Sequence, residues 1–257
     1  MNTTSLKLIL VSLLLATSTA HGGQFVDRQR RAPRFRAAEA QHMASVEQRF
    51  RDAGAAWPPK VMFRGFKLEG RFEVWAAPAA GDRWVPVESL AVCAASGVLG
   101  PKRRQGDLQV PEGYYHIERF NPRSQFHLSL GINYPNAVDR AHRIRGRALG
   151  GDIFIHGSCV TIGCLPLQDE PMEAVYLAAV AARDAGQRRI PVHLFPCAFG
   201  TETCEAALTA VGEGELAQAA RWAELRAGFG AFEATRQPPR VRPLASGHYR
   251  IRVVGAP

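Results

Sequence analysis

Apolar and polar residues alternate with helical periodicity near the start of the chain. The segment FRAAEAQHMASVEQRFRDAG carries apolar residues at helical spacing, with arginine, glutamine and glutamate between them. This spacing predicts an amphipathic helix with a basic outer face, which Gly54 ends. The apolar positions that define it are Phe35, Met43, Val46 and Phe50. We therefore expect a basic helical N-terminal segment over residues 21–56.

After the WPPK stretch the pattern changes to short runs of β type. Val, Phe and Trp dominate VMFRGFK, RFEVWAA and WVPVESLAVC, with Gly or Pro between the runs. These features predict a β-meander over residues 61–93. Further strands are predicted from YYHIERF, FHLSLGINY, DIFIHG, IPVHLFPCAF and HYRIRVV.

Two later segments are predicted to be helices. DEPMEAVYLAAVAARDAG opens with acids and Pro171 and closes at Gly186, which are common helix-start and helix-end residues. GEGELAQAARWAELRAGF predicts another helix, and PNAVDRAHRIRGRALGG a basic helix or loop. The pattern as a whole predicts an α+β fold, with a β-rich mixed sheet or sandwich and peripheral helices. We expect a central domain over residues 57–200 and a C-terminal helix and strand extension over residues 201–257.

The first residues, MNTTSLKLILVSLLLATSTA, have the pattern of a secretory signal peptide. Lys7 precedes an apolar run over residues 8–15, and the small residues Ser18 and Ala20 follow. A membrane span needs about 20 apolar residues, so this run is too short for one. The alternatives are an uncleaved anchor or a buried first helix. We expect a signal peptide over residues 1–20 and export of the remaining chain.

The chain is basic, with 32 Lys and Arg against 23 Asp and Glu and a formal net charge of +9. A basic exported protein attracts anionic partners such as cell-wall polymers, lipid headgroups or substrates with free carboxylates. No recognised nucleic-acid-binding motif accompanies the arginines, and no later segment has the length and apolarity of a membrane span. We therefore expect no nucleic-acid partner, and no transmembrane helix after signal removal.

Cysteine usage suggests one free thiol. The five cysteines are Cys93, Cys159, Cys164, Cys197 and Cys204. In an oxidising compartment an odd number leaves one cysteine unpaired, and such a thiol is a candidate for reactivity. Cys197 and Cys204 could form a small local bridge, or both could be buried free thiols.

The segment IHGSCVTIGC groups His156, Cys159 and Cys164 closely, and four interpretations apply. Structural zinc usually has two close pairs of ligands, and only one loose group exists here, so we expect no metal. A bridge between Cys159 and Cys164 would close a tight loop and neutralise both thiols. The histidine could also be an ordinary core imidazole at a strand end.

The fourth interpretation is a cysteine nucleophile with a histidine base. His156 would raise the thiolate fraction of Cys164, and the Gly163 N–H could stabilise a developing oxyanion. A predicted helix begins soon after Cys164, and a helix N-terminus would lower the pKa of the thiol. Cys159 is expected to pack as a small apolar residue.

These residues resemble the active-site segment of the L,D-transpeptidases, whose catalytic domain is called YkuD-type. The matching motifs are His156-Gly157 and Thr161-Ile162-Gly163-Cys164, and Pro111-Glu112-Gly113 resembles an earlier strand-turn of the family. The resemblance covers about residues 61–199 and marks residues 57–200 as the catalytic domain. Its compact motif resembles a Gram-negative branch of murein L,D-transpeptidase-like proteins, which implies a periplasmic location.

The resemblance implies a β-rich fold and a two-step acyl transfer without a cofactor. The substrates would be peptidoglycan stem peptides, cut at the L-centre of diaminopimelate through a Cys164 thioester. Some of the branch instead release a wall-attached lipoprotein by hydrolysis. A non-catalytic wall-binding protein is the other alternative, whereas a thiol-disulfide protein would have the C-x-x-C spacing that this chain lacks.

Two features depart from the family pattern. Cys164 follows His156 by only eight positions, and Pro166 stands where an arginine is common. The substrate's carboxylate must then be held elsewhere, and an arginine is the expected partner. The candidate substrate-binding residues are His127, Tyr134, Gly157, Thr161 and Arg145.

Overall fold

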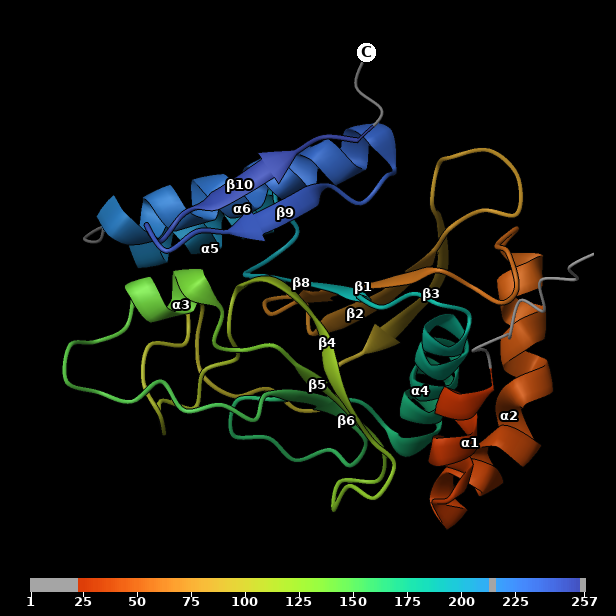
Figure 1. The fold of residues 1–257 in the computed structure, drawn as a ribbon. Helices are drawn as coiled ribbons and strands as arrows, with labels where there is room; N and C mark the ends of the chain where they lie inside the picture. The colour runs from red at the N-terminus through yellow and green to blue at the C-terminus, as the bar shows by residue number, and fades with distance from the viewer. Residues whose placement is uncertain (1–22, 213–215, 255–257) are drawn as a thin grey trace, which may run out of the picture.

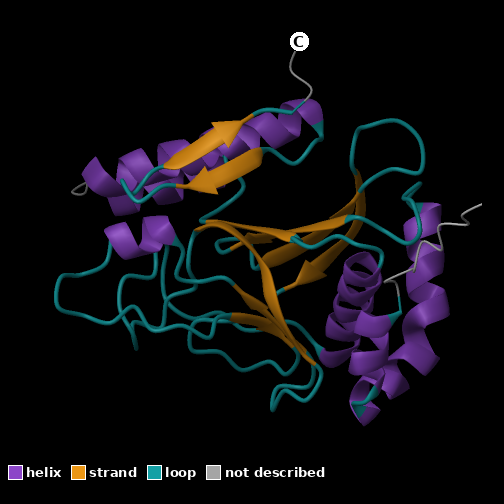
Figure 2. Ribbon diagram, in the orientation of Figure 1, coloured by secondary structure: helices purple, strands orange, loops and turns teal. Residues whose placement is uncertain are grey.

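A computed structural model describes residues 23–212 and 216–254 (Figures 1 and 2). The signal peptide expected over residues 1–20 lies outside the described residues. The chain folds around one eight-stranded mixed sheet, with the strand order β3-β2-β1-β8-β4-β5-β6-β7. Helices cover the sheet, and a separate two-stranded ribbon lies outside one of them (Figure 1). The fold is therefore α+β, as the sequence predicts.

One end of the sheet is the predicted meander. Its strands are β1 (Val61–Phe66), β2 (Arg71–Ala76) and β3 (Val85–Ala91). β1 and β2 are antiparallel, as are β2 and β3. β8 (Pro191–Phe195) then pairs in parallel with β1, because the chain returns to the sheet after a long excursion.

The other end of the sheet carries the segment with His156 and Cys164. Its strands are β4 (Gly113–Asn121), β5 (Ser129–Ile132), β6 (Phe154–His156) and β7 (Leu165–Pro166). β4, β5 and β6 are antiparallel to their neighbours, whereas β7 runs parallel to β6. The IHGSCVTIGC segment therefore leaves the end of β6 and returns at its other end.

Three helices pack together on one side of the molecule (Figure 1). They are α1 (Gln24–Arg30), α2 (Pro33–Asp52) and α4 (Asp169–Asp184). The N-terminal segment thus holds two helices rather than the single one expected. Pro33 begins the second helix, where its missing N–H costs nothing. Phe35 is fully buried and lies edge-on to Tyr176 of α4, so these helices share the main core.

The remaining elements lie on the other side of the sheet. They are α3 (Ala137–Ala141), α5 (Glu202–Gly212), α6 (Leu216–Thr235), β9 (Arg240–Pro243) and β10 (Tyr249–Arg252). The sequence pattern did not reveal α5 or β9. Within the described residues, no helix is long and apolar enough to cross a membrane.

Glu112 connects α6 to the sheet. Its side chain is fully buried and accepts hydrogen bonds from Lys67 Nζ at 3.0 Å and Trp222 Nε1 at 2.8 Å. The Gly100 N–H donates to the same carboxylate at 2.7 Å. Arg221 of α6 donates to the Glu112 carbonyl oxygen at 2.9 Å. The C-terminal helix is therefore joined to the Pro111-Glu112-Gly113 turn by buried polar contacts.

Replacing Glu112 with alanine should lower the free energy of unfolding by about 3–5 kcal/mol, because Lys67 would stay buried without its counter-charge. Urea unfolding followed by circular dichroism measures the loss. The double variant Lys67→Met/Glu112→Leu should recover much of it, since both charges are then absent. A double variant as unstable as the single one would contradict this explanation.

Candidate active site

The strand register sets the geometry of the site. Arg119 of β4 pairs with Gly131 of β5, which pairs with Phe154 of β6. Cys164 lies beside Phe154, whose N–H is 3.4 Å from the cysteine sulfur. Side chains alternate along a strand, so His156 lies on the same face as Phe154. The residues that face the core instead are Leu130, Ile155 and Leu165. Cys164 and His156 are therefore diagonal neighbours on one face of the sheet.

Cys164 is a free, partly buried thiol. Its sulfur accepts from the Phe154 N–H and lies 3.7 Å from the Asp152 carbonyl oxygen. Burial raises the pKa of this thiol; the Phe154 hydrogen bond and the Lys102 ammonium oppose the shift, and the Asp152 carboxylate adds to it. The lowered pKa expected from a helix N-terminus is therefore wrong. β7 separates Cys164 from the start of α4 at Asp169, and burial dominates.

His156 is buried and held in one tautomer. Its Nδ1 lies 2.6 Å from the Gly157 carbonyl oxygen, which can only accept, so Nδ1 carries the hydrogen. Nε2 is then left with a lone pair, and it makes no hydrogen bond to any residue in the described part of the chain. Burial lowers the pKa of His156, and the Gly157 contact opposes this only in part. The ring of Phe126 lies over the imidazole, 5.0 Å between centroids. The imidazole is thus neutral near pH 7 and can accept a proton at Nε2.

Thr161 organises the loop that carries the cysteine. Its hydroxyl oxygen accepts from the N–H groups of Gly163, at 3.1 Å, and Cys164, at 2.8 Å. The same hydroxyl donates to the Cys164 carbonyl oxygen at 2.9 Å. Gly163 has a φ of 133°, which a side chain would strain. The Gly163 N–H, expected as an oxyanion donor, is therefore engaged by Thr161 in this structure, and its role in the reaction stays a prediction.

Gly157 is required by close packing. A Cβ at this position would lie 2.6 Å from Asp169 Oδ1 and 2.7 Å from His127 Cβ. His127 Nε2 lies 2.6 Å from a Glu173 carboxylate oxygen, and His42 Nε2 of α2 lies 2.9 Å from the other. The predicted His127 therefore lies beside the loop between His156 and Cys164, where it links this loop to α4 and α2.

A disulfide fastens the same loop to the end of the meander. Cys159 is bonded to Cys93, and the Cys93 N–H donates to the Pro166 carbonyl oxygen at 3.0 Å. This overturns the expectation that Cys159 packs as a small apolar residue. It also overturns a bridge between Cys159 and Cys164, and the bonded Cys159 sulfur is not available as a zinc ligand.

The second disulfide joins Cys197 and Cys204. Of the two alternatives for this pair, the local bridge is therefore confirmed. All five cysteines are thus accounted for, and Cys164 is the unpaired one. Within the described residues, no group of three or more His, Cys, Asp and Glu residues is arranged to hold a metal ion.

Two predicted substrate-binding residues lie elsewhere. Tyr134 is buried, and its hydroxyl points to the carbonyl oxygens of Lys102 and Leu149, at 3.4 and 3.5 Å. It therefore holds two loops together in the core rather than lining a pocket. Arg145 lies exposed in the loop after α3, and no contact joins it to Cys164.

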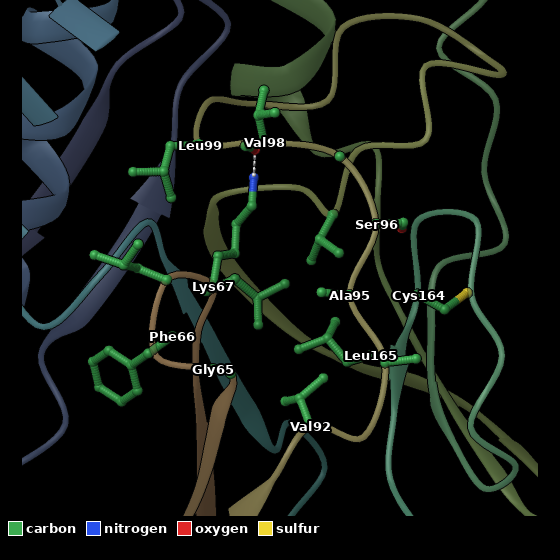
Figure 3. Close-up of a pocket in the computed structure, with 16 residues that line it drawn as sticks. Gly65, Phe66, Lys67, Val92, Ala95, Ser96, Val98, Leu99, Cys164 and Leu165 are labelled. Atoms are coloured by element: carbon green, nitrogen blue, oxygen red, sulfur yellow. Dashed lines mark hydrogen bonds between the residues drawn. The ribbon is translucent and has the colours of Figure 1, made fainter. Parts of the chain in front are cut away.

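An apolar pocket of about 230 Å³ lies next to the cysteine backbone (Figure 3). Its lining includes Gly65, Val92, Ala95, Val98, Leu165 and Leu194. Figure 3 shows the Cys164 sulfur directed away from the other lining side chains. Leu165 belongs to the core-facing side of the sheet, opposite to His156. A ligand in this pocket would therefore not meet the sulfur, which lies on the sheet face that carries His156.

Comparison with known proteins identifies the family of the chain. No family model matches the chain. YafK of Escherichia coli K12, a candidate L,D-transpeptidase, is 33% identical over 193 residues, which cover 74% of this chain and 73% of that protein. The chain belongs to the L,D-transpeptidase family.

Two solved structures align with part of the chain at lower sequence identity. The helical cell shape determining protein Pgp2 of Campylobacter jejuni aligns with a TM-score of 0.41 and 19% identity, over 59% of this chain and 55% of that one. L,D-transpeptidase 1 of Mycobacterium tuberculosis aligns with a TM-score of 0.30 and 13% identity, over 53% of this chain and 62% of that one. The chain spans less than two thirds of either protein.

In the L,D-transpeptidase family an arginine is common at the position that Pro166 occupies here. Two other cationic side chains lie near the Cys164 sulfur in this chain. Arg119 lies in the same cross-strand row as Cys164, stacks on Phe154 at 4.7 Å and pairs with Asp152 at 2.7 Å. Lys102 is buried and bonded to Asp107 at 2.6 Å. Sequence reasoning missed Arg119 and Lys102, because only the folded register and the loop packing bring them to Cys164.

Alkylation of Cys164 should depend on pH in a way that reports its burial. Iodoacetamide reacts with the thiolate, and the raised pKa means that less thiolate is present at a given pH. We expect the folded protein to be alkylated with a midpoint above the ordinary cysteine value of about 8.5. Unfolding in urea without reductant should bring the midpoint back to that value. Mass spectrometry follows the single free thiol, and a folded midpoint below the unfolded one would contradict the shift.

Proposed function

We propose that the chain is an exported cysteine acyltransferase of the L,D-transpeptidase type, which acts on peptidoglycan stem peptides in the periplasm. One observation carries the proposal. The free thiol of Cys164 and the available Nε2 of His156 lie on one face of the sheet, two positions apart on paired strands. Family membership supports the substrate class, and the predicted signal peptide supports the location.

The resting pair is neutral. Burial disfavours both the thiolate and the imidazolium, as the raised pKa of Cys164 and the lowered pKa of His156 indicate. His156 therefore acts as a general base during the attack instead of forming a stable ion pair beforehand. The Gly157 carbonyl oxygen, bonded to Nδ1, orients the ring and stabilises the imidazolium that forms.

The reaction then has two steps. The Cys164 sulfur attacks the carbonyl carbon at the L-centre of diaminopimelate while its proton passes to His156 Nε2. The tetrahedral intermediate collapses to a thioester, and the imidazolium gives its proton to the leaving amine of D-alanine. An amine of a second stem then attacks the thioester to give a crosslink, or water attacks it to give hydrolysis.

Arg119 is the candidate anchor for the substrate's free carboxylate, in place of the residue at Pro166. It is half exposed, and its ion pair with Asp152 is exposed on both sides, at 46% and 77% of the side chains. An exposed pair of this kind contributes little to stability, so a substrate carboxylate can replace Asp152 at small cost. The guanidinium would then hold the carboxylate in the same row as the sulfur.

The second candidate function is hydrolysis that releases a wall-attached lipoprotein. The observation that favours it is Pro166, which has neither a charge nor an N–H to hold the donor against water. Nucleophile and base are the same in both reactions. In the hydrolysis the leaving amine belongs to the lipoprotein instead of D-alanine, it takes its proton from the imidazolium, and water then resolves the thioester.

Purified sacculi that carry tetrapeptide stems and lipoprotein-linked stems test the assignment. Cys164→Ser should abolish all change in the muropeptides, and His156→Gln should slow it about 10²- to 10⁴-fold, the usual range for loss of a general base. His116→Gln, on the same sheet but away from the site, should retain activity. New dimers joined between two diaminopimelates support transfer, whereas loss of lipoprotein remnants without dimers supports hydrolysis. Full activity of folded Cys164→Ser would refute the proposal.

The role of Arg119 as carboxylate anchor is tested by changing both the arginine and the carboxylate of the stem peptide. Arg119→Gln should weaken kcat/KM for stems with a free carboxylate about 10- to 100-fold, the range for loss of a hydrogen-bonded charge. Wild-type protein should discriminate against stems whose carboxylate is amidated, and the variant should not. Arg123→Gln, an exposed arginine just beyond β4, is the matched control. Equal discrimination in variant and wild type would place the anchor elsewhere.

A further inference from the structure

The C-terminal ribbon carries a ladder of arginines. β9 and β10 are antiparallel, and their register places Arg240 opposite Arg252 and Arg242 opposite Arg250. All four side chains are exposed, whereas the alternate residues Val241, Tyr249 and Ile251 pack inward. The ribbon lies on the outer side of α6 (Figure 1), so the four guanidinium groups share one outward face.

These arginines have no counter-charge among residues 23–212 and 216–254. None of the four side chains makes a hydrogen bond or ion pair with a residue in the described part of the chain. The nearby Glu224 is already bonded to the His248 ring at 2.5 Å and to the Tyr249 N–H at 2.9 Å. Like charges directly opposite each other weaken a β-ribbon. The ladder therefore opposes the stability of the hairpin that carries it, which points to an external anion.

A second group of arginines adjoins the ribbon. The turn between β9 and β10 contacts the end of α3, where the Gly247 carbonyl oxygen lies 2.8 Å from His142 Nε2. The loop after His142 presents three exposed arginines that make no side-chain contact with the described residues. They are Arg143, Arg145 and Arg147. Backbone hydrogen bonds hold the loop at its two ends. The Ile144 N–H donates to the Arg103 carbonyl oxygen at 3.3 Å, and the Ala148 carbonyl oxygen accepts from the Gln105 N–H at 2.7 Å. We call these three arginines and the four of the ladder the arginine face.

Exposed apolar side chains interrupt the arginine face. Ile144, between Arg143 and Arg145, is 41% exposed, and Val253, next to Arg252, is 46% exposed. Cations that alternate with apolar side chains suit a lipid interface, where the apolar groups enter the acyl boundary and the cations meet phosphate. A polymer of phosphates would need only the cations. The arginines also lie on a raised ribbon and an outer loop instead of lining a groove.

We propose that the arginine face docks the protein onto a bilayer that contains anionic phospholipids. This inference is independent of the activity of Cys164. A basic residue near a negatively charged membrane strengthens binding about fivefold, so seven of them are enough for reversible association. The attraction should weaken with added salt, because the side chains are exposed.

The experiment uses the chain from His21 onward, so that the apolar run over residues 8–15 is absent. Co-sedimentation compares vesicles of phosphatidylcholine alone with vesicles that also contain phosphatidylglycerol. Binding should require phosphatidylglycerol and fall as salt rises. The double variant Arg240→Glu/Arg242→Glu should bind at least tenfold more weakly. Its glutamates face Arg252 and Arg250, so its Tm should be equal to or above that of the wild type.

The matched control is Arg31→Glu/Arg36→Glu, which makes the same change in net charge at α1 and α2. It should bind vesicles within about twofold of the wild type. Equal weakening of both double variants would show that only net charge matters and would overturn the proposal. A heparin or DNA fragment bound through the same arginines, without binding to phosphatidylglycerol vesicles, would overturn it in favour of a polymeric partner.

Discussion

A two-residue parallel pairing positions the site. Ile155 lies opposite Leu165 and His156 opposite Pro166, and no longer pairing joins β6 to β7. A shift of one residue would turn the Cys164 side chain toward the core, because side chains alternate between the faces of a sheet. So short a pairing has little stability of its own, and its register must be held by contacts around it.

Those contacts come from distant parts of the chain. The Leu167 N–H donates to the His156 carbonyl oxygen at 2.8 Å and continues the ladder. On the outer side, Cys93 pairs with Pro166 through its N–H and with Cys159 through its sulfur. Backbone strain is concentrated in the same region, since Asp152, Ser158 and His127 all have positive φ. Hydrogen bonds and a disulfide from distant parts of the chain therefore converge on one loop.

The N-terminal helices contribute to the same loop. Arg34 of α2 donates to the carbonyl oxygens of Ser124 and His127, which flank Phe126. Phe126 in turn covers His156. His42 of α2 shares the Glu173 carboxylate with His127. The helical segment is thus in contact with the residues that support the base.

Sequence periodicity predicted the helices and strands better than it predicted the contacts between them. The meander, α4 and the strand that ends at His156 follow from local patterns, and the His-Gly and Gly-Cys motifs indicated the family. The partner of Cys159 did not follow, because it lies 66 residues earlier, and neither did Arg119, which reaches the site only through strand register. The predicted lowering of the Cys164 pKa was wrong. Burial dominates the shift, and the sequence does not reveal burial because it is a property of the folded chain.

The disulfide between Cys93 and Cys159 also bears on how the chain matures. Cys159 is much closer in sequence to Cys164 than to Cys93, so a chain oxidised while still unfolded would favour the short bridge and lose its nucleophile. The strand pairing at Pro166 brings Cys93 to the loop, while the Phe154 N–H holds the Cys164 sulfur on the other side of it. If β7 docks before oxidation, Cys164 remains a free thiol while the other four cysteines form two disulfides. The edge strand thus favours the correct disulfide as well as holding Cys164 in place.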